Sequence, residues 1–382
     1  MVDLSEQLES VFNIIINHSC KIKPGEKILI EAIDVIPKYL EILLKGIINI
    51  GAFPILNMKE KWQMDLLALN ASEDLFNTLA DIEIYQMQQV SKMIGLRTYR
   101  GSKDHLNIGE NSKNIILKHF IHPVHYDYRN NHLKWIYFRI PSSDWAKNSE
   151  MEEKDFYNYY FRSVLLDYQR MGSFFLPLKT LLERTDRVCI KSYGTDLTFS
   201  IKGQGVVIDN GIINLPDGEV HTAPVLDSIN GSVRFNIDST YYGDRFRNVA
   251  LTFQDGQVIK AMSDSNNDKL HQILNMDEGA RYAGEFAIGL NPFIDKPLND
   301  ILFDEKIYGS FHLALGNSYK EGGNGNRSCI HWDLILDQKI GSGGGELYFD
   351  NQLIRKDGMF VHRDLEHLNP ENLKKEILIN HG

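Results

Sequence analysis

Four segments decide the fold of this chain: NLPDGEVHTAP (Asn214–Pro224), AGEFAIGLNP (Ala283–Pro292), FHLALGNSY (Phe311–Tyr319) and CIHWDLILD (Cys329–Asp337). Each is typical of a core strand that carries one or two acidic or histidine side chains. These side chains are Glu219, Glu285, His312, His331 and Asp333. A buried carboxylate is costly unless it is paired, hydrogen-bonded or bound to a cation. Three carboxylates and two imidazoles in such surroundings therefore predict a divalent-metal site.

Each candidate ligand also has a simpler interpretation. His331 and Asp333 form an H-x-D, and residues i and i+2 of a strand project from one face; a core-edge histidine bonded to a carboxylate would look the same. Glu219 follows the turn Pro216-Asp217-Gly218 and could instead be exposed. Glu285 is the only charge in its apolar run, which favours a ligand. His312 could be an ordinary hydrogen-bonded core histidine.

The rest of the second half reads as short β-runs with few helices. Asp255-Gly256 between two alternating runs predicts a hairpin, and we expect a helix over 269–276. GSGGGE (Gly341–Glu346) has neither the spacing nor the following helix of a nucleotide loop, and we expect a turn there.

The first half has the pattern of an α/β domain. A strand over 24–32, a helix over 36–50 and a strand over 52–58 make a βαβ unit, with further strands expected over 81–87 and 133–140. No GxGxxG follows the first strand, so a dinucleotide site is not expected. A long helix is expected over 150–171, and we place the domain boundary near Thr185. The predicted architecture is an α/β N-terminal domain (1–185) and an α+β, largely antiparallel β, metal-binding catalytic domain (186–382).

Composition excludes several classes of protein. The 382 residues carry a net charge of −10, which argues against a nucleic-acid partner. The acidic N-terminus lacks the basic region of a signal peptide, and no apolar run reaches bilayer length, so we expect a cytoplasmic protein without a membrane partner. The three cysteines are widely spaced without a CxxC, which supports neither a disulfide framework nor a cysteine zinc site. GxSxG, HExxH and P-loop motifs are missing as well, so catalysis would rest on metals.

Together the four segments resemble the M29 metallopeptidases, the aminopeptidase T/AmpS family. PGEKILIEA, the helix that ends in Gly-Ala and IPSSDWAKNSEM extend the resemblance to the N-terminal half. It implies two divalent metal ions (Zn, Co, Mn or Mg) with Glu219, Glu285, His312, His331 and Asp333 as ligands. It implies Tyr319 and Glu219 as catalytic residues, the tyrosine hydrogen-bonding the oxyanion. Peptide substrates and a homodimer are implied too.

Two departures and two alternatives accompany the resemblance. His221 stands where the family usually has phenylalanine, and the loop between His312 and His331 is shorter than in well-known bacterial members. The first alternative is a mononuclear non-haem iron dioxygenase that uses His312, His331 and Asp333 as a facial triad. Such a triad does not need Glu219 and Glu285, whereas a two-metal site does. The second alternative is a catalytically silent binding protein, which would purify without metal.

Overall fold

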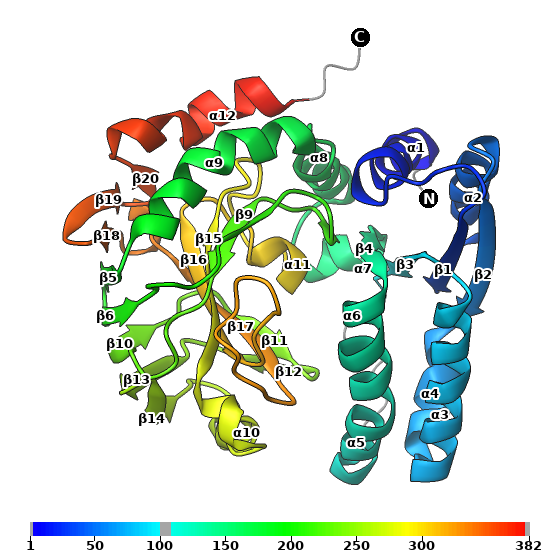
Figure 1. Cartoon of the computed structure of the whole chain (residues 1–382), viewed down its shortest axis with the longest axis horizontal. Helices are drawn as coiled ribbons and strands as arrows, with labels where there is room; N and C mark the ends of the chain where they lie inside the picture. Colours follow the sequence, from blue (N-terminus) through cyan, green and yellow to red (C-terminus); the bar gives the residue numbers. More distant parts are fainter. Residues whose placement is uncertain (1–2, 100–107, 379–382) are drawn as a thin grey trace. The chain divides into compact units, whose positions relative to one another are not determined.

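The computed structural model describes residues 3–99 and 108–378, and the chain forms two compact units (Figure 1). The first comprises Met1–Leu165 and Gly211–Leu215, and the second comprises Leu166–Asn210 and Pro216–Gly382. The boundary predicted near Thr185 lies at the end of helix α9 (Tyr168–Arg184), which belongs to the second unit. The metal-binding role of the C-terminal domain stays a prediction. In the described ranges, no helix is long and apolar enough to cross a membrane.

The first unit is built on a five-stranded parallel sheet in the order β2-β1-β3-β4-β8. Its strands are β1 (Lys27–Ile33), β2 (Phe53–Lys59), β3 (Lys92–Thr98), β4 (Lys134–Ile140) and β8 (Asn214–Leu215). Every residue of β1 after Lys27 is buried, as expected of a parallel strand that is covered on both faces. The pairing of β1 with β2 confirms the predicted βαβ unit.

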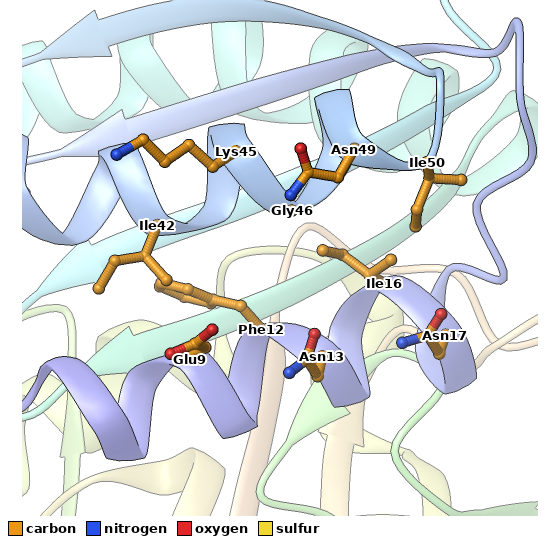
Figure 2. Close-up of a pocket in the computed structure, with 10 residues that line it drawn as sticks. All are labelled: Glu9, Phe12, Asn13, Ile16, Asn17, Ile42, Lys45, Gly46, Asn49 and Ile50. Carbon is orange, nitrogen blue, oxygen red and sulfur yellow. The ribbon is translucent and has the colours of Figure 1, made fainter.

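The helices of this unit are α1 (Ser5–Ile14), η1 (Ile15–Ser19), α2 (Pro37–Asn49), α3 (Lys61–Leu69), α4 (Glu73–Gln88), α5 (Glu110–Ile116), η3 (Leu117–Arg129), α6 (Asn130–His132), α7 (Ser143–Asn148) and α8 (Glu153–Val164). Figure 2 shows a hollow where α1 and η1 face α2. Its lining has one carboxylate, Glu9, and no histidine or cysteine. This hollow therefore lacks the donors of the predicted metal site.

Two predictions about helices and strands were wrong. Residues 81–87 lie in α4, not in a strand; Phe76, Ala80, Glu83 and Met87 are its buried face, and the side chain of Ser72 caps its start. The apparent alternation came from exposed apolar side chains. The helix expected over 150–171 is two helices, α8 and α9, because the chain leaves helical geometry at Leu165 and the Asp167 side chain caps the next helix.

The second unit contains an eight-stranded antiparallel sheet in the order β14-β13-β10-β6-β5-β18-β19-β20. Its strands are β5 (Arg187–Ser192), β6 (Thr195–Ser200), β10 (Asn230–Arg234), β13 (Ala250–Gln254), β14 (Gln257–Met262), β18 (Gly345–Phe349), β19 (Gln352–Lys356) and β20 (Met359–Phe360). The predicted hairpin at Asp255-Gly256 joins β13 to β14, and both residues have the positive φ of a type I′ turn.

A five-stranded antiparallel sheet in the order β17-β16-β15-β9-β7 completes the core of this unit. Its strands are β7 (Val207–Asp209), β9 (Glu219–Thr222), β15 (Ala283–Gly289), β16 (Ser310–Gly316) and β17 (His331–Asp337), beside the small ribbon β11 (Ser239–Tyr241) and β12 (Asp244–Phe246). The helices are α9, α10 (Asn267–Leu274), η4 (Glu278–Arg281), α11 (Ile301–Asp304), η5 (Ile340–Ser342), η6 (Arg363–Leu368) and α12 (Pro370–Ile377). Helix α10 confirms the helix expected over 269–276. Helices α9 and α12 lie side by side (Figure 1).

Candidate metal centre

The five-stranded sheet brings the five predicted ligands together on four adjacent strands. Glu219 begins β9, Glu285 lies on β15, His312 lies on β16, and β17 carries both His331 and Asp333. All residues of β9, β15 and β16 are buried. The strands are thus core strands, as their apolar neighbours predicted, and the polar side chains lie inside the second unit.

The register of the sheet places these five side chains on one face. Residues directly opposite each other in an antiparallel pair project to the same side. The opposed pairs are Glu219 with Gly289, Ala314 with both Glu285 and Asp333, Ala287 with His312, and Gly316 with His331. These four opposed positions are alanine or glycine, whereas Ile335 also faces His312 and Asp209 also faces Glu219. The alanines and glycines leave room on that face for ions and substrate.

Glu285 lies between two groups of potential donors. Its Oε1 is 3.6 Å from His312 Nε2, and its Oε2 is 3.3 Å from His331 Nε2. Asp333 Oδ1 is 3.5 Å from His331 Nε2 and 3.8 Å from His312 Nε2. One group is Glu219–Glu285–His312 and the other is Glu285–His331–Asp333, with donor atoms within 4.8 Å of one another in each group. A carboxylate that turns one oxygen to each group suits a ligand shared by two ions.

Neighbouring groups orient the donors. His331 Nδ1 lies 2.8 Å from the carbonyl of Asn317, so the Nδ1–H tautomer leaves Nε2 free to bind a cation. Lys306 Nζ is 2.5 Å from Glu219 Oε1. Glu219 Oε2 is buried and has no hydrogen-bond partner among the described residues. An unpartnered buried carboxylate oxygen is what a missing cation would satisfy.

The charges of the metal-free protein support this interpretation. Burial opposes ionisation of Glu285, but the imidazoles of His312 and His331 outweigh it and hold the pKa of Glu285 well below its usual range. Burial likewise opposes protonation of His312, yet Glu219 leads the carboxylates that raise the pKa of His312 to about 9. Protonated histidines therefore neutralise the carboxylates without metal. Divalent cations would replace those protons.

Sequence reasoning missed two charged residues at the site, Lys306 and Glu305. Lys306 is 2% exposed, and its Nζ lies 2.8 Å from Glu305 Oε1 and 3.5 Å from Asp217 Oδ1. Glu305 also shares a donor group with His312 and Asp333, and its burial raises the pKa of Glu305 to about 8. The signal in the sequence was the run of three charges in FDEKIYG, inside an apolar stretch.

Tyr319 follows β16 and lies over the donor groups. Its ring centroid is 5.0 Å from that of His331 and 5.7 Å from that of His221. The residue is 42% exposed, whereas burial around its hydroxyl raises the pKa of Tyr319. The glycine-rich loop after Tyr319 is anchored to neighbouring segments, because the Asn324 amide donates to the carbonyls of Pro224 and Ala283.

The donor set fits divalent transition metals. Each group combines carboxylate oxygens with an imidazole nitrogen, a mixture that suits Zn²⁺, Co²⁺ or Mn²⁺. The buried, unpartnered Glu219 Oε2 and the small residues opposite the donors are consistent with ions at this face. The residues present therefore fit a metal centre.

The chain matches the family described as thermophilic metalloprotease (M29) over residues 4–360. It is 32% identical over 176 residues to aminopeptidase AmpS of Bacillus subtilis, a match that covers 38% of this chain and 42% of AmpS. It is 23% identical over 400 residues to aminopeptidase PepS of Streptococcus thermophilus, covering 87% of this chain and 92% of PepS. The first of these matches thus spans less than half of the relative's length.

Two solved structures have a similar fold. AmpT from Thermus thermophilus superposes with a TM-score of 0.80 at 17% identity, covering 94% of this chain and 100% of AmpT. The 2,5-dihydroxypyridine dioxygenase from Pseudomonas putida superposes with a TM-score of 0.60 at 14% identity, covering 96% of this chain and 100% of the dioxygenase. Both likenesses concern the fold alone. The family match extends over nearly the whole sequence, and the chain belongs to the M29 family of metalloproteases.

Proposed function

We propose that this protein is a metal-dependent aminopeptidase that removes N-terminal residues from peptides. Glu219, Glu285, His312, His331 and Asp333 would hold two divalent cations, Zn²⁺, Co²⁺, Mn²⁺ or Mg²⁺. The observation that carries the proposal is the position of Glu285, whose two oxygens face the imidazoles of the two donor groups. The family membership and the relatives named as aminopeptidases support the reaction class.

The carboxylates favour hydrolysis over iron-dependent oxygenation. His312, His331 and Asp333 alone could form a facial triad. Glu219 and Glu285 would then be two further buried carboxylates, 4% and 3% exposed, beside a single ion. A second cation balances their charge better. The similarity to a dioxygenase of this fold does not change that argument, because fold does not determine chemistry.

Bound divalent cations would activate a water molecule and polarise the scissile carbonyl. The residues of the chain would supply the remaining steps. Tyr319 would donate its hydroxyl hydrogen bond to the oxyanion that develops on the carbonyl. Glu305 holds a proton near neutral pH because burial raises its pKa to about 8, so its carboxyl suits transfer of a proton to the leaving amine. Lys306 and Glu219 would fix each other's position through their 2.5 Å contact.

The decisive experiment removes the metal with a chelator and assays leucine and other aminoacyl chromogenic amides after adding Co²⁺, Mn²⁺ or Zn²⁺. We expect metal-restored release of the N-terminal residue and no cleavage of the same amide with an acetylated amino group. Glu285→Gln, which keeps the shape of the side chain, should lose both activity and bound metal. Oxygen uptake with Fe²⁺, together with no amide hydrolysis, would replace this proposal by the oxygenase.

We also propose that the protein is a homodimer, as the resemblance implies, and that it is cytoplasmic, as the sequence predicts. Strand β2 lies at one edge of the first unit's sheet, and an edge strand is open to pairing. Phe53 and Met58 of this strand and Trp62 of the following helix are 59%, 53% and 59% exposed. Exposed apolar side chains at a sheet edge support an interface. Sedimentation equilibrium would test this, and a monomer at micromolar concentration would contradict it.

A further inference from the structure

His221 is a buried imidazole that the two donor groups do not use. It is 7% exposed and is paired with Ala287 on β15 and with Val207 on β7. Since Ala287 also faces His312, His221 projects from the same face of the sheet as the candidate ligands. Its Nδ1 lies 4.0 Å from Glu285 Oε1.

Asp209 on β7 is the partner of His221. The register pairs Asp209 with Glu219 directly, which places the two carboxylates on the same face. His221 Nδ1 is hydrogen-bonded to Asp209 Oδ2. Asp209, Glu219 and His221 each offer one donor atom, and these three atoms lie within 4.8 Å of one another. Neighbouring strands thus bring together two carboxylates and one imidazole, the same kinds of donor as in the other two groups.

Two buried polar atoms of this group lack partners. Within the described part of the chain, Glu219 Oε2 and His221 Nε2 have no hydrogen-bond partner. Lys306 contacts Oε1 of Glu219, so the other oxygen stays available. Buried polar atoms in folded proteins nearly always have a partner. Glu219 Oε2 lies 3.8 Å from His312 Nε2 and therefore faces the two-ion centre, which leaves His221 Nε2 as the unpartnered atom that belongs to this group alone.

We propose that Asp209, Glu219 and His221 form a third divalent-cation position, joined to the proposed two-ion centre through Glu219. The three donor groups then follow each other across the sheet, with Glu219 shared by the first pair and Glu285 shared by the second pair. This inference rests on the proposed function. It goes beyond that function because it adds His221 and Asp209 to the metal site and raises the number of ions to three per chain.

Metal content tests the proposal without measuring activity. The chelated protein is reloaded with Co²⁺, desalted and analysed by inductively coupled plasma mass spectrometry. We expect three ions per chain in the wild type and two in His221→Phe, which removes the imidazole and keeps an aromatic side chain. Asp209→Asn should also lose the third ion, so a folding defect in one variant does not decide the result. His271→Phe, which removes a histidine of α10 outside these groups, should keep three.

The cobalt absorption spectrum provides a second measurement. Titration of the wild type should change the d–d bands up to the third equivalent, and titration of His221→Phe should stop at the second. Two ions in both proteins would overturn the third position and leave the proposed function intact. If the wild type retained no ion, both the third position and the proposed function would be overturned. Glu285→Gln tests the two-ion centre separately, because this variant should lose bound metal whether or not a third position exists.

Discussion

Replacing Lys306 with methionine would test the electrostatic balance of the site. Lys306 is 2% exposed and lies among three carboxylates: its Nζ is 2.5 Å from Glu219, 2.8 Å from Glu305 and 3.5 Å from Asp217. Methionine has nearly the same length and volume, so Lys306→Met removes the positive charge without leaving a large cavity. The carboxylates then lose their cation while they stay buried.

The expected cost follows from the burial of the whole cluster. Removing one partner of a buried ion pair costs about 3–5 kcal/mol, because the remaining charge has no compensation. We expect a loss of about this size in the chelated protein. With divalent metal added, Glu219 would have another cation at Oε2, so the loss in the free energy of unfolding should be clearly smaller. A smaller loss of stability in the metal-loaded protein than in the chelated protein would indicate that Glu219 binds metal.

Urea unfolding followed by hydrogen-exchange mass spectrometry measures this effect, because peptides from β9 and β16 report on the second unit separately from the first. Lys356→Met is the matched control; its partner Glu346 lies 3.3 Å away, and the two side chains are 54% and 30% exposed. Exposed pairs contribute little, so the control should unfold like the wild type. A chelated Lys306→Met protein that is as stable as the control would refute the reasoning.

Three further predictions concern other parts of the site. Tyr319→Phe should lower kcat by about 10²–10³-fold through loss of an oxyanion donor and leave metal content unchanged; an unchanged kcat would remove the tyrosine from the mechanism. Ala314→Leu should reduce the bound metal measured by mass spectrometry, because Ala314 faces both Glu285 and Asp333 and a larger side chain would fill the space between them. Full metal content would show that the metal does not need this space. In the chelated protein, the neighbouring carboxylates raise the pKa of His312 from its ordinary 6.5 to about 9. The native state therefore holds a proton that the unfolded state releases, so the melting temperature should be highest below pH 6.5 and fall as pH rises through about 9; a rise over this range would contradict the assigned charges.

The sequence was sufficient to name the five candidate side chains that the structure brings together on one face of a sheet. Glu285 and His312 could be found because strands without surface positions should contain no unpaired charge, and their neighbours are apolar on both sides. The H-x-D of His331 and Asp333 could be placed on one face because the side-chain period of a strand is two. The error over residues 81–87 has the same origin, since Ile82 alternates with Asp81 and Glu83 but is 51% exposed on a helix.

Asp209 and Lys306 show what local patterns miss. Asp209 stands before Asn210-Gly211, a combination that predicts a turn, and only the register of β7 with β9 places it opposite Glu219. Lys306 reads as one charge in a polar run, although it is almost completely buried. Both residues acquire their roles from strands and segments that are distant in the sequence.

Local sequence patterns also cannot predict the number of bound ions, which decides between hydrolysis and iron-dependent oxygenation. The facial triad and the two-ion centre share His312, His331 and Asp333, so the sequence alone could separate them only by the presence of two more carboxylates. The structure adds the position of Glu285. The ladder between β15 and β16 shifts register between Ala283 and Glu285, and Glu285 then faces Ala314 with one oxygen toward each imidazole. A carboxylate in this place suits a ligand shared by two ions, and this position is the basis of the proposed two-metal centre.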